Sequence, residues 1–221
     1  MILAAGRGSR LRPLTDTTPK PLLEVGGEPL IAHHLRKLAA AGIREVVVNT
    51  GWLGTQLPAA LGDGGAWGVS IAWSHEGWPA LDTGGGIRNA LPLLGDAPFL
   101  LVNSDVWSDI DYAGLVEEPA RKDLGRLVLV PNPPEHPDGD FGLRDGRVDC
   151  GNAPRRTYAG LAVLRPEILG DARGGFPLAP LLREAARQKR LAGRLSMARW
   201  QDVGTPERLE ALRRSCNHAG D

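Results

Sequence analysis

The sequence predicts an α/β fold, with helices on both faces of a mixed, mostly parallel central sheet. Two observations predict it. Short apolar runs alternate with amphipathic stretches along the chain. A glycine-rich loop follows the first apolar run, and a second glycine cluster stands immediately before an expected helix. With 221 residues, the chain is long enough to bury a substantial core. It has no internal repeat and no low-complexity tail, so we expect a single domain over residues 1–221.

The apolar runs and the helical periodicity give the expected elements in order. Strands are expected at residues 1–5, 43–49, 69–73, 99–102, 127–131 and 158–164, and extended chain around 195–200. Helices are expected at residues 29–41, 85–94 and 178–189, and a last helix should begin with Thr205 as N-cap and Pro206 in the first position. In the first helix the residues that share one side are Leu30, His34, Leu35 and Leu38, and Gly42 ends it.

Residues 132–156 are the least regular stretch, rich in proline, glycine and charge. Because they interrupt an otherwise continuous α/β pattern, they favour a functional loop or a small excursion over a domain boundary.

Composition excludes several classes of function. Lys+Arg and Asp+Glu both number 26, so no net field favours nucleic acid or a membrane surface. No apolar run of about 18 residues indicates a spanning helix, and the N-terminus does not resemble a secretory signal. Cys150 and Cys216 lack CxxC spacing, which favours free thiols and a cytoplasmic protein. The histidines, His136 among them, have no zinc-ligand spacing.

The loop after the first strand is the most informative segment. Gly6 and Gly8 let main-chain N–H groups point inward, which suits an anion. Four cations fall within this short stretch and favour a triphosphate, namely Arg7, Arg10, Arg12 and Lys20. The loop has neither the GxxxxGK[ST] nor the GxGxxG pattern. An ordinary βα turn with a basic rim is the alternative interpretation.

The wider pattern resembles a known family. Residues 3–15 read Leu-x-x-Gly-x-Gly-Ser-Arg-x-x-Pro-x-Thr, and Pro19-Lys20-Pro21 follows, which is similar to the signature of sugar nucleotidyltransferases. Further matching stretches occur in the family's order over nearly the full chain, at residues 29–31, 82–86, 103–107 and 200–206. In length and in residues 93–107 the chain resembles the short bacterial uridylyltransferases of cell-wall recycling. The resemblance implies a three-layer Rossmann-like nucleotidyltransferase fold without a C-terminal left-handed β-helix domain.

The resemblance also implies roles for individual residues. It makes Arg10 and Lys20 catalytic, through charge placed near the phosphates, and Asp105 and Asp202 ligands of Mg²⁺. Nucleotide contacts fall on residues 1–25 and the second glycine cluster, at Leu3, Ala4, Ala5, Gly6, Gly8, Ser9, Thr83 and Gly84. Sugar contacts fall mainly on residues 132–165, at Asn103, Gly142, Asn152 and Gly160. Glu76 is a weaker candidate for either ligand.

The residues agree with this chemistry, since in-line displacement at phosphorus is accelerated mainly by positioning and fixed positive charge. Asp105 follows an apolar strand, at the strand end where open α/β sheets bind ligands. Two departures from the family stand out. Ser104 replaces the usual glycine, and the Glu-Lys-Pro sugar motif is missing, with Asn152-Ala153-Pro154 as its nearest remnant.

The implied reaction transfers UMP from UTP to N-acetylmuramic acid α-1-phosphate and releases pyrophosphate, in a monomer or small homo-oligomer. One alternative is a mannose-, glucose- or heptose-1-phosphate enzyme that uses GTP, TTP or UTP, because only pocket-lining residues choose base and sugar. The other is an inactive regulatory subunit that binds nucleotide sugars on the same fold.

Overall fold

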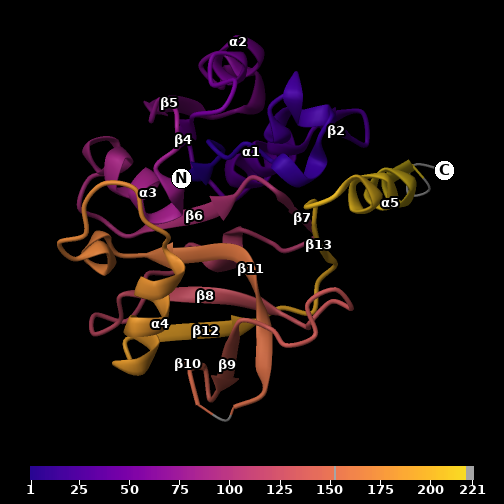
Figure 1. The fold of residues 1–221 in the computed structure, drawn as a ribbon. Coiled ribbons are helices and arrows are strands. Elements are labelled where there is room, and N and C mark those ends of the chain that lie inside the picture. Colours follow the sequence, from indigo (N-terminus) through magenta and orange to yellow (C-terminus); the bar gives the residue numbers. More distant parts are fainter. Residues whose placement is uncertain (152, 218–221) are drawn as a thin grey trace.

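A nine-stranded mixed sheet runs through the protein (Figure 1). The computed structural model describes residues 1–151 and 153–217. The strand order is β5-β4-β1-β6-β11-β8-β12-β10-β9. The strand bounds are β1 Ile2–Leu3, β4 Glu45–Thr50, β5 Ser70–His75, β6 Phe99–Asn103, β8 Gly125–Val130, β9 Phe141–Arg144, β10 Arg147–Asp149, β11 Arg155–Leu164 and β12 Leu191–Leu195.

The sheet is parallel in its first half and largely antiparallel in its second. Strands β5, β4, β1 and β6 pair in parallel. Strand β11 runs antiparallel to both β6 and β8, and only β8 and β12 are parallel beyond it. The expectation of a mixed α/β sheet is confirmed.

Helices cover both faces of the sheet. Their bounds are α1 Leu30–Ala40, α2 Gln56–Leu61, α3 Asp82–Leu94, α4 Ala179–Arg187 and α5 Pro206–Asn217, with 3₁₀ turns at Ser9–Leu11, Leu14–Asp16, Lys20–Leu22, Gly65–Trp67, Ala113–Leu115 and Pro166–Leu169. One core cluster packs α1 and α2 on one face, and a second packs α3 and α4 on the other. Successive side chains of a strand point to opposite faces, so Leu100 joins the first cluster and Leu101 the second. The result is three layers.

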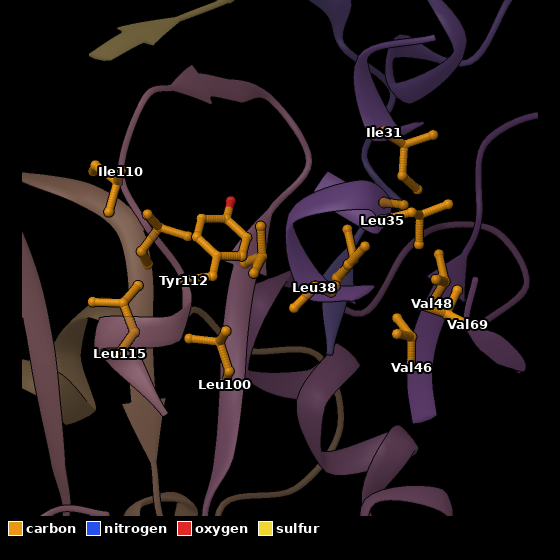
Figure 2. Packing of buried hydrophobic residues seen from close by; sticks show 14 of the residues in the cluster. Ile31, Leu35, Leu38, Val46, Val48, Val69, Leu100, Ile110, Tyr112 and Leu115 are labelled. Atoms are coloured by element: carbon orange, nitrogen blue, oxygen red, sulfur yellow. The ribbon is translucent and has the colours of Figure 1, made fainter. Parts of the chain in front are cut away.

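Figure 2 shows the first of these clusters, with Ile31, Leu35 and Leu38 of α1 facing Val46 and Val48 of β4. On the other side of the same cluster, residues 110–115 close the core near Leu100 (Figure 2).

Two small strand pairs lie outside the main sheet. They are β2 Glu24–Val25 with β3 Glu28–Pro29, and β7 Val106–Ser108 with β13 Trp200–Asp202. A third core cluster joins the N-terminal segment to the C-terminal helix through Leu11, Val25, Val203, Leu209 and Leu212. Helix α5 therefore lies beside β2 (Figure 1), and its residues Leu209 and Leu212 share a core cluster with Leu11 of the segment that follows β1.

Several expected elements shift. The helix predicted from residue 85 begins at Asp82, because Gly84 and Gly85 are part of its first turn, where their N–H groups donate to Phe176 O. The extended chain expected around 195–200 covers the end of β12, the start of β13 and the connection between them. The irregular stretch 132–156 contains the β9–β10 hairpin, and sequence patterns missed α2. The N-cap at Thr205 is confirmed, since Arg208 N donates to its Oγ1.

Within residues 1–151 and 153–217, no helix is both long and apolar enough to cross a lipid bilayer.

Candidate active site

The glycine loop leaves β1 at the carboxyl edge of the parallel strands. Ala4 N–H donates to Asn49 Oδ1 at 2.6 Å, and Trp52 N–H donates to Ala5 O at 3.1 Å, so β4 and the residues after it hold this exit. Gly8 has a φ of +65°, and a Cβ there would lie 3.1 Å from Thr15 Cγ2 and 3.2 Å from Lys20 Cβ. A glycine at this position lets the loop fold back onto Lys20.

Two pockets open at this edge. The first has a volume of about 350 Å³, and its lining includes residues 3–6 and 8–10, Lys20, Asn49, Glu76, Asp82, Thr83, Asn103, Ser104, Asp105 and Gly204. The second has a volume of about 310 Å³, and its lining includes Arg10, Asn103, Asp105, Glu135, His136, Asp140, Thr157, Tyr158, Gly160, Trp200, Asp202 and Arg208. Arg10, Asn103 and Asp105 line both pockets, so the two form one continuous cleft.

The β7–β13 pair brings the two aspartates together. Asp202 pairs with Val106, and Val203 N–H donates to Asp105 O at 2.8 Å. A Cβ at Gly204 would lie 2.7 Å from Asp202 Oδ1 and 3.0 Å from Arg10 Nη2, which places the Arg10 guanidinium beside Asp202. Residues far apart in the chain thus meet around one cleft.

Each aspartate contacts a cation of the protein. Lys20 Nζ lies 2.9 Å from Asp105 Oδ2, and the Lys20 side chain is only 10% exposed. Arg208 Nη1 lies 3.0 Å from Asp202 Oδ2. Lys20 is therefore held at the cleft floor by Asp105, where its charge is only partly hydrated.

The aspartates fit a divalent cation that is shared with a ligand. Asp202 Oδ1 is buried and has no hydrogen-bond partner among the described residues. Burial first, and then the nearby Asp105 carboxylate, raise the pKa of Asp202 above its ordinary value. The described residues hold no cluster of three or more His, Cys, Asp or Glu side chains suited to a metal. Two carboxylates that meet at one cleft, one of them with an oxygen that has no partner among the described residues, suit Mg²⁺, which commonly takes one or two carboxylates and completes its shell with phosphates and water.

A polar pair forms the floor of the first pocket. Asn49 Nδ2 donates to Glu76 Oε1 at 2.5 Å, and Leu81 N–H donates to Glu76 Oε2 at 2.8 Å. A Cβ at Gly86 would lie 2.8 Å from Asn49 Nδ2, so this glycine leaves room for the pair. Sequence analysis missed Asn49, although it stands near the end of a valine-rich strand, as Asn103 does.

Most of the residues expected to contact nucleotide line the first pocket, from Leu3 to Ser9 and at Thr83. Gly84 does not, because it packs against Phe176. The expectation that four cations surround the triphosphate is wrong for two of them. Arg7 stacks 4.5 Å from the Trp52 ring and Arg12 pairs with Asp16, and neither lines the two pockets.

Only some of the residues expected to contact the sugar line a pocket. Asn103 and Gly160 line the second pocket, where a φ of +72° and a Cβ position 2.9 Å from Asn103 Cβ favour glycine at residue 160. Gly142 is buried in β9 and lines neither pocket, since a Cβ there would meet Asp149 O at 2.9 Å. Asn152 lies outside the described residues.

The opposite wall of the second pocket was missed by sequence analysis. Arg208 Nε lies 3.2 Å from Glu135 Oε1, and His136 Nε2 lies 3.1 Å from Asp140 Oδ1. Tyr158 N–H donates to the other oxygen of Asp140 at 2.8 Å. The charged, proline-rich composition of residues 132–140 was the available signal, but it did not single out side chains.

This cleft, with cations and carboxylates at the carboxyl edge of a three-layer α/β sheet, defines an enzyme that transfers nucleotidyl groups. The chain belongs to the nucleotidyl transferase family, whose sequence profile matches residues 1–146. An N-acetylmuramate alpha-1-phosphate uridylyltransferase of Neisseria meningitidis serogroup B is 49% identical over 218 residues, which cover 95% of this chain and 94% of the relative. The enzyme of the same description from Caulobacter vibrioides is 37% identical, over 94% of this chain and 92% of the relative.

Solved structures share the fold. A Bacillus anthracis protein crystallised with sucrose superposes with a TM-score of 0.84 at 23% identity, over 97% of this chain and 93% of that one. HddC from Yersinia pseudotuberculosis, crystallised with GMP-PN, superposes with a TM-score of 0.80 at 20% identity, over 97% of both chains.

Proposed function

We propose that this enzyme transfers UMP from UTP to N-acetylmuramic acid α-1-phosphate, giving UDP-N-acetylmuramic acid and pyrophosphate, with Mg²⁺ as the metal. Support comes from the two relatives of that description, which match nearly end to end. The observation that carries the proposal is the meeting of two pockets at Arg10, Asn103 and Asp105. One pocket holds the nucleotide and the other the sugar phosphate, with their reacting groups at the junction.

The transfer needs no nucleophile from the protein. An oxygen of the sugar phosphate attacks the α-phosphorus of UTP, and the bond from that phosphorus to the oxygen bridging the β-phosphate breaks. The electron pair of that bond leaves with pyrophosphate. Holding both substrates at the junction supplies the proximity that such a displacement requires.

The chain's cations do the electrostatic work. Arg10 lies at the junction and stabilises the negative charge that grows on the departing pyrophosphate, and Lys20 at the cleft floor contacts the α-phosphate. Mg²⁺ held by Asp105, Asp202 and phosphate oxygens would supply further positive charge at the transferred group. Asn49 and Glu76 form a polar floor for the nucleoside.

The test crosses UTP, GTP and TTP with the 1-phosphates of N-acetylmuramic acid, N-acetylglucosamine, mannose, glucose and heptose, and measures pyrophosphate release. The proposal predicts the highest kcat/KM for UTP with N-acetylmuramic acid α-1-phosphate. A preference for GTP with mannose 1-phosphate would instead align the enzyme with more distant relatives, such as a mannose-1-phosphate guanylyltransferase of Mycobacterium tuberculosis, 41% identical over 53% of this chain and 32% of the relative. Binding of UDP-sugar without any pyrophosphate release would indicate a regulatory subunit.

A further inference from the structure

The proposed acceptor has one group that ordinary hexose 1-phosphates lack. N-acetylmuramic acid is N-acetylglucosamine with a lactyl ether at C3, and the lactyl group ends in a carboxylate. Taking this charge from water into a pocket costs free energy unless a charged or hydrogen-bonding partner meets it. The second pocket should therefore contain a cationic donor that is away from the reacting phosphates.

Three side chains of the second pocket can carry positive charge: Arg10, Arg208 and His136. Arg10 also lines the first pocket and lies beside Asp202, at the phosphate junction. Arg208 contacts two carboxylates already, Asp202 through Nη1 and Glu135 through Nε. Both arginines are thus engaged by the reaction centre or by the protein's own acids.

His136 differs, because it meets a single carboxylate. Its Nε2 lies 3.1 Å from Asp140 Oδ1, and Asp140 is itself held by the Tyr158 N–H. No described residue forms a hydrogen bond with His136 Nδ1, and the side chain is 42% exposed. One ring nitrogen is therefore anchored and the other is available to a ligand.

The loop that carries His136 is well held. His136 N–H donates to Pro133 O at 2.9 Å, and Asn132 Nδ2 donates to Pro137 O at 2.8 Å. Gly139 has a φ of +58°, and a Cβ there would lie 2.7 Å from Asn132 Oδ1, so the turn depends on this glycine. These contacts hold the backbone of the loop in place before a ligand arrives, which lowers the entropic cost of binding.

We infer that His136 determines specificity for the acidic sugar by binding the lactyl carboxylate. The ring contacts Asp140 through Nε2, which leaves Nδ1 to meet the substrate carboxylate. This inference rests on the proposed function, since it assigns a role within the same cleft. The residue touches the substrate away from the transferred phosphoryl group, so it acts on substrate choice and not on the chemical step.

The experiment compares His136→Gln with wild type on two acceptors that differ only in the lactyl group, the α-1-phosphates of N-acetylmuramic acid and N-acetylglucosamine. We expect kcat/KM for the acid sugar to fall by about 10- to 100-fold, mainly through KM, because a hydrogen bond to a charged group is lost. The value for N-acetylglucosamine 1-phosphate should stay within about twofold. His33→Gln is the matched control, since His33 also lies beside a carboxylate, at 3.3 Å from Glu28, but outside both pockets.

A substrate analogue whose lactyl group ends in a neutral amide provides a second, variant-free measurement. With wild type, kcat/KM for the amide analogue should be lower than for the acid sugar by about the same factor. His136→Gln should not lower kcat/KM for the analogue any further. An equal fall in kcat/KM for the two sugar phosphates, or an unchanged ratio between them, would overturn the assignment while the proposed function stands. If wild type does not turn over the acid sugar at all, the proposed function fails, and the inference fails with it.

Discussion

The two pockets of the cleft are built in different ways. The first is lined largely by residues 3–20 and by side chains where β4, β5 and β6 end or α3 begins. The second is assembled from a loop at 132–140, from β11 and β13, and from α5. In the reaction we propose, phosphate binding would thus depend on one short segment at a parallel sheet edge, whereas acceptor binding would depend on the packing of several distant segments.

The electrostatics of the pockets differ as well. At the junction, Lys20 and Asp105 neutralise each other, while one oxygen of Asp202 has no partner in the part of the chain that the structure describes. In the outer part of the second pocket, two acids of the 132–140 loop each contact one basic side chain. The first arrangement suits cations and phosphates that exchange partners during a reaction, and the second suits a fixed recognition surface.

The largest expected effect comes from the junction. Asp105→Ala should lower kcat for pyrophosphate release by at least about 100-fold, because it removes a metal ligand and the partner of Lys20. Circular dichroism should report an intact fold. Asp109→Ala is the matched control, since Asp109 is exposed, lines neither pocket, and its carboxylate lies 3.8 Å from Arg199. Near-normal kcat in the Asp105 variant would show that the metal assignment is wrong.

Lys20→Met separates the two tasks of the lysine. It should reduce kcat by about 100-fold, since a fixed charge near the phosphates is lost. In the absence of nucleotide, however, it should bind Mn²⁺ more tightly than wild type, because Lys20 no longer competes for Asp105. Electron paramagnetic resonance measures free Mn²⁺ directly, and Lys122→Met, at an exposed site, serves as control. Weaker Mn²⁺ binding by the Lys20 variant would contradict this competition.

Gly86→Ala tests whether the pockets act separately. The added methyl group would displace Asn49 and Glu76 at the floor of the first pocket. We expect KM for UTP to rise by about tenfold, as for the loss of one or two buried hydrogen bonds, with KM for the sugar phosphate within about twofold. Steady-state kinetics with each substrate varied in turn gives both constants. An equal rise in the two values would mean that the pockets are not independent.

The smallest effect concerns stability. The pKa of Asp202 is raised by burial, so its charged form is disfavoured in the folded protein at neutral pH. Without divalent cations, Asp202→Asn should therefore raise the free energy of unfolding slightly at pH 7, even though it abolishes metal-dependent turnover. The gain should shrink as the pH falls through the raised pKa of the folded carboxyl group, and vanish only where the carboxyl group of the unfolded chain is protonated too. Urea unfolding of wild type and variant in the presence of a chelator, at pH 7 and at acidic pH, measures this difference in the free energy of unfolding. A variant that is less stable than wild type at pH 7 would contradict the expectation.

The sequence predicted the first pocket far better than the second. Gly6, Gly8, Arg10 and Lys20 stand close together in the chain, so their spacing alone indicated an anion site. Asp105 could be predicted from the sequence because it follows an apolar strand. Asp202 could be predicted only from the family resemblance, because local sequence patterns do not show the β7–β13 pairing that brings it close to Asp105.

The second pocket eluded sequence analysis for a physical reason. His136 and Asp140 look like loop residues of ordinary composition, and their pairing depends on the Tyr158 N–H of a distant strand. Gly142 and Gly84 were expected to contact ligands, but they allow close packing within the protein. The sequence could not distinguish the two roles, because a glycine does not reveal which backbone or side chain approaches it. Periodicity placed most helices and strands to within a few residues, whereas short strands such as β7 lack a periodic signal.

In the reaction we propose, nucleotide and sugar phosphate meet at Arg10, Lys20, Asp105 and Asp202. A crystal structure with Mg²⁺ and UDP-N-acetylmuramic acid tests it most directly. We expect the nucleoside in the first pocket, the sugar in the second, and the linking phosphates between Lys20 and Arg10, with the metal on both aspartates. A product bound with its phosphates away from these four side chains would show that the reaction does not take place at this junction.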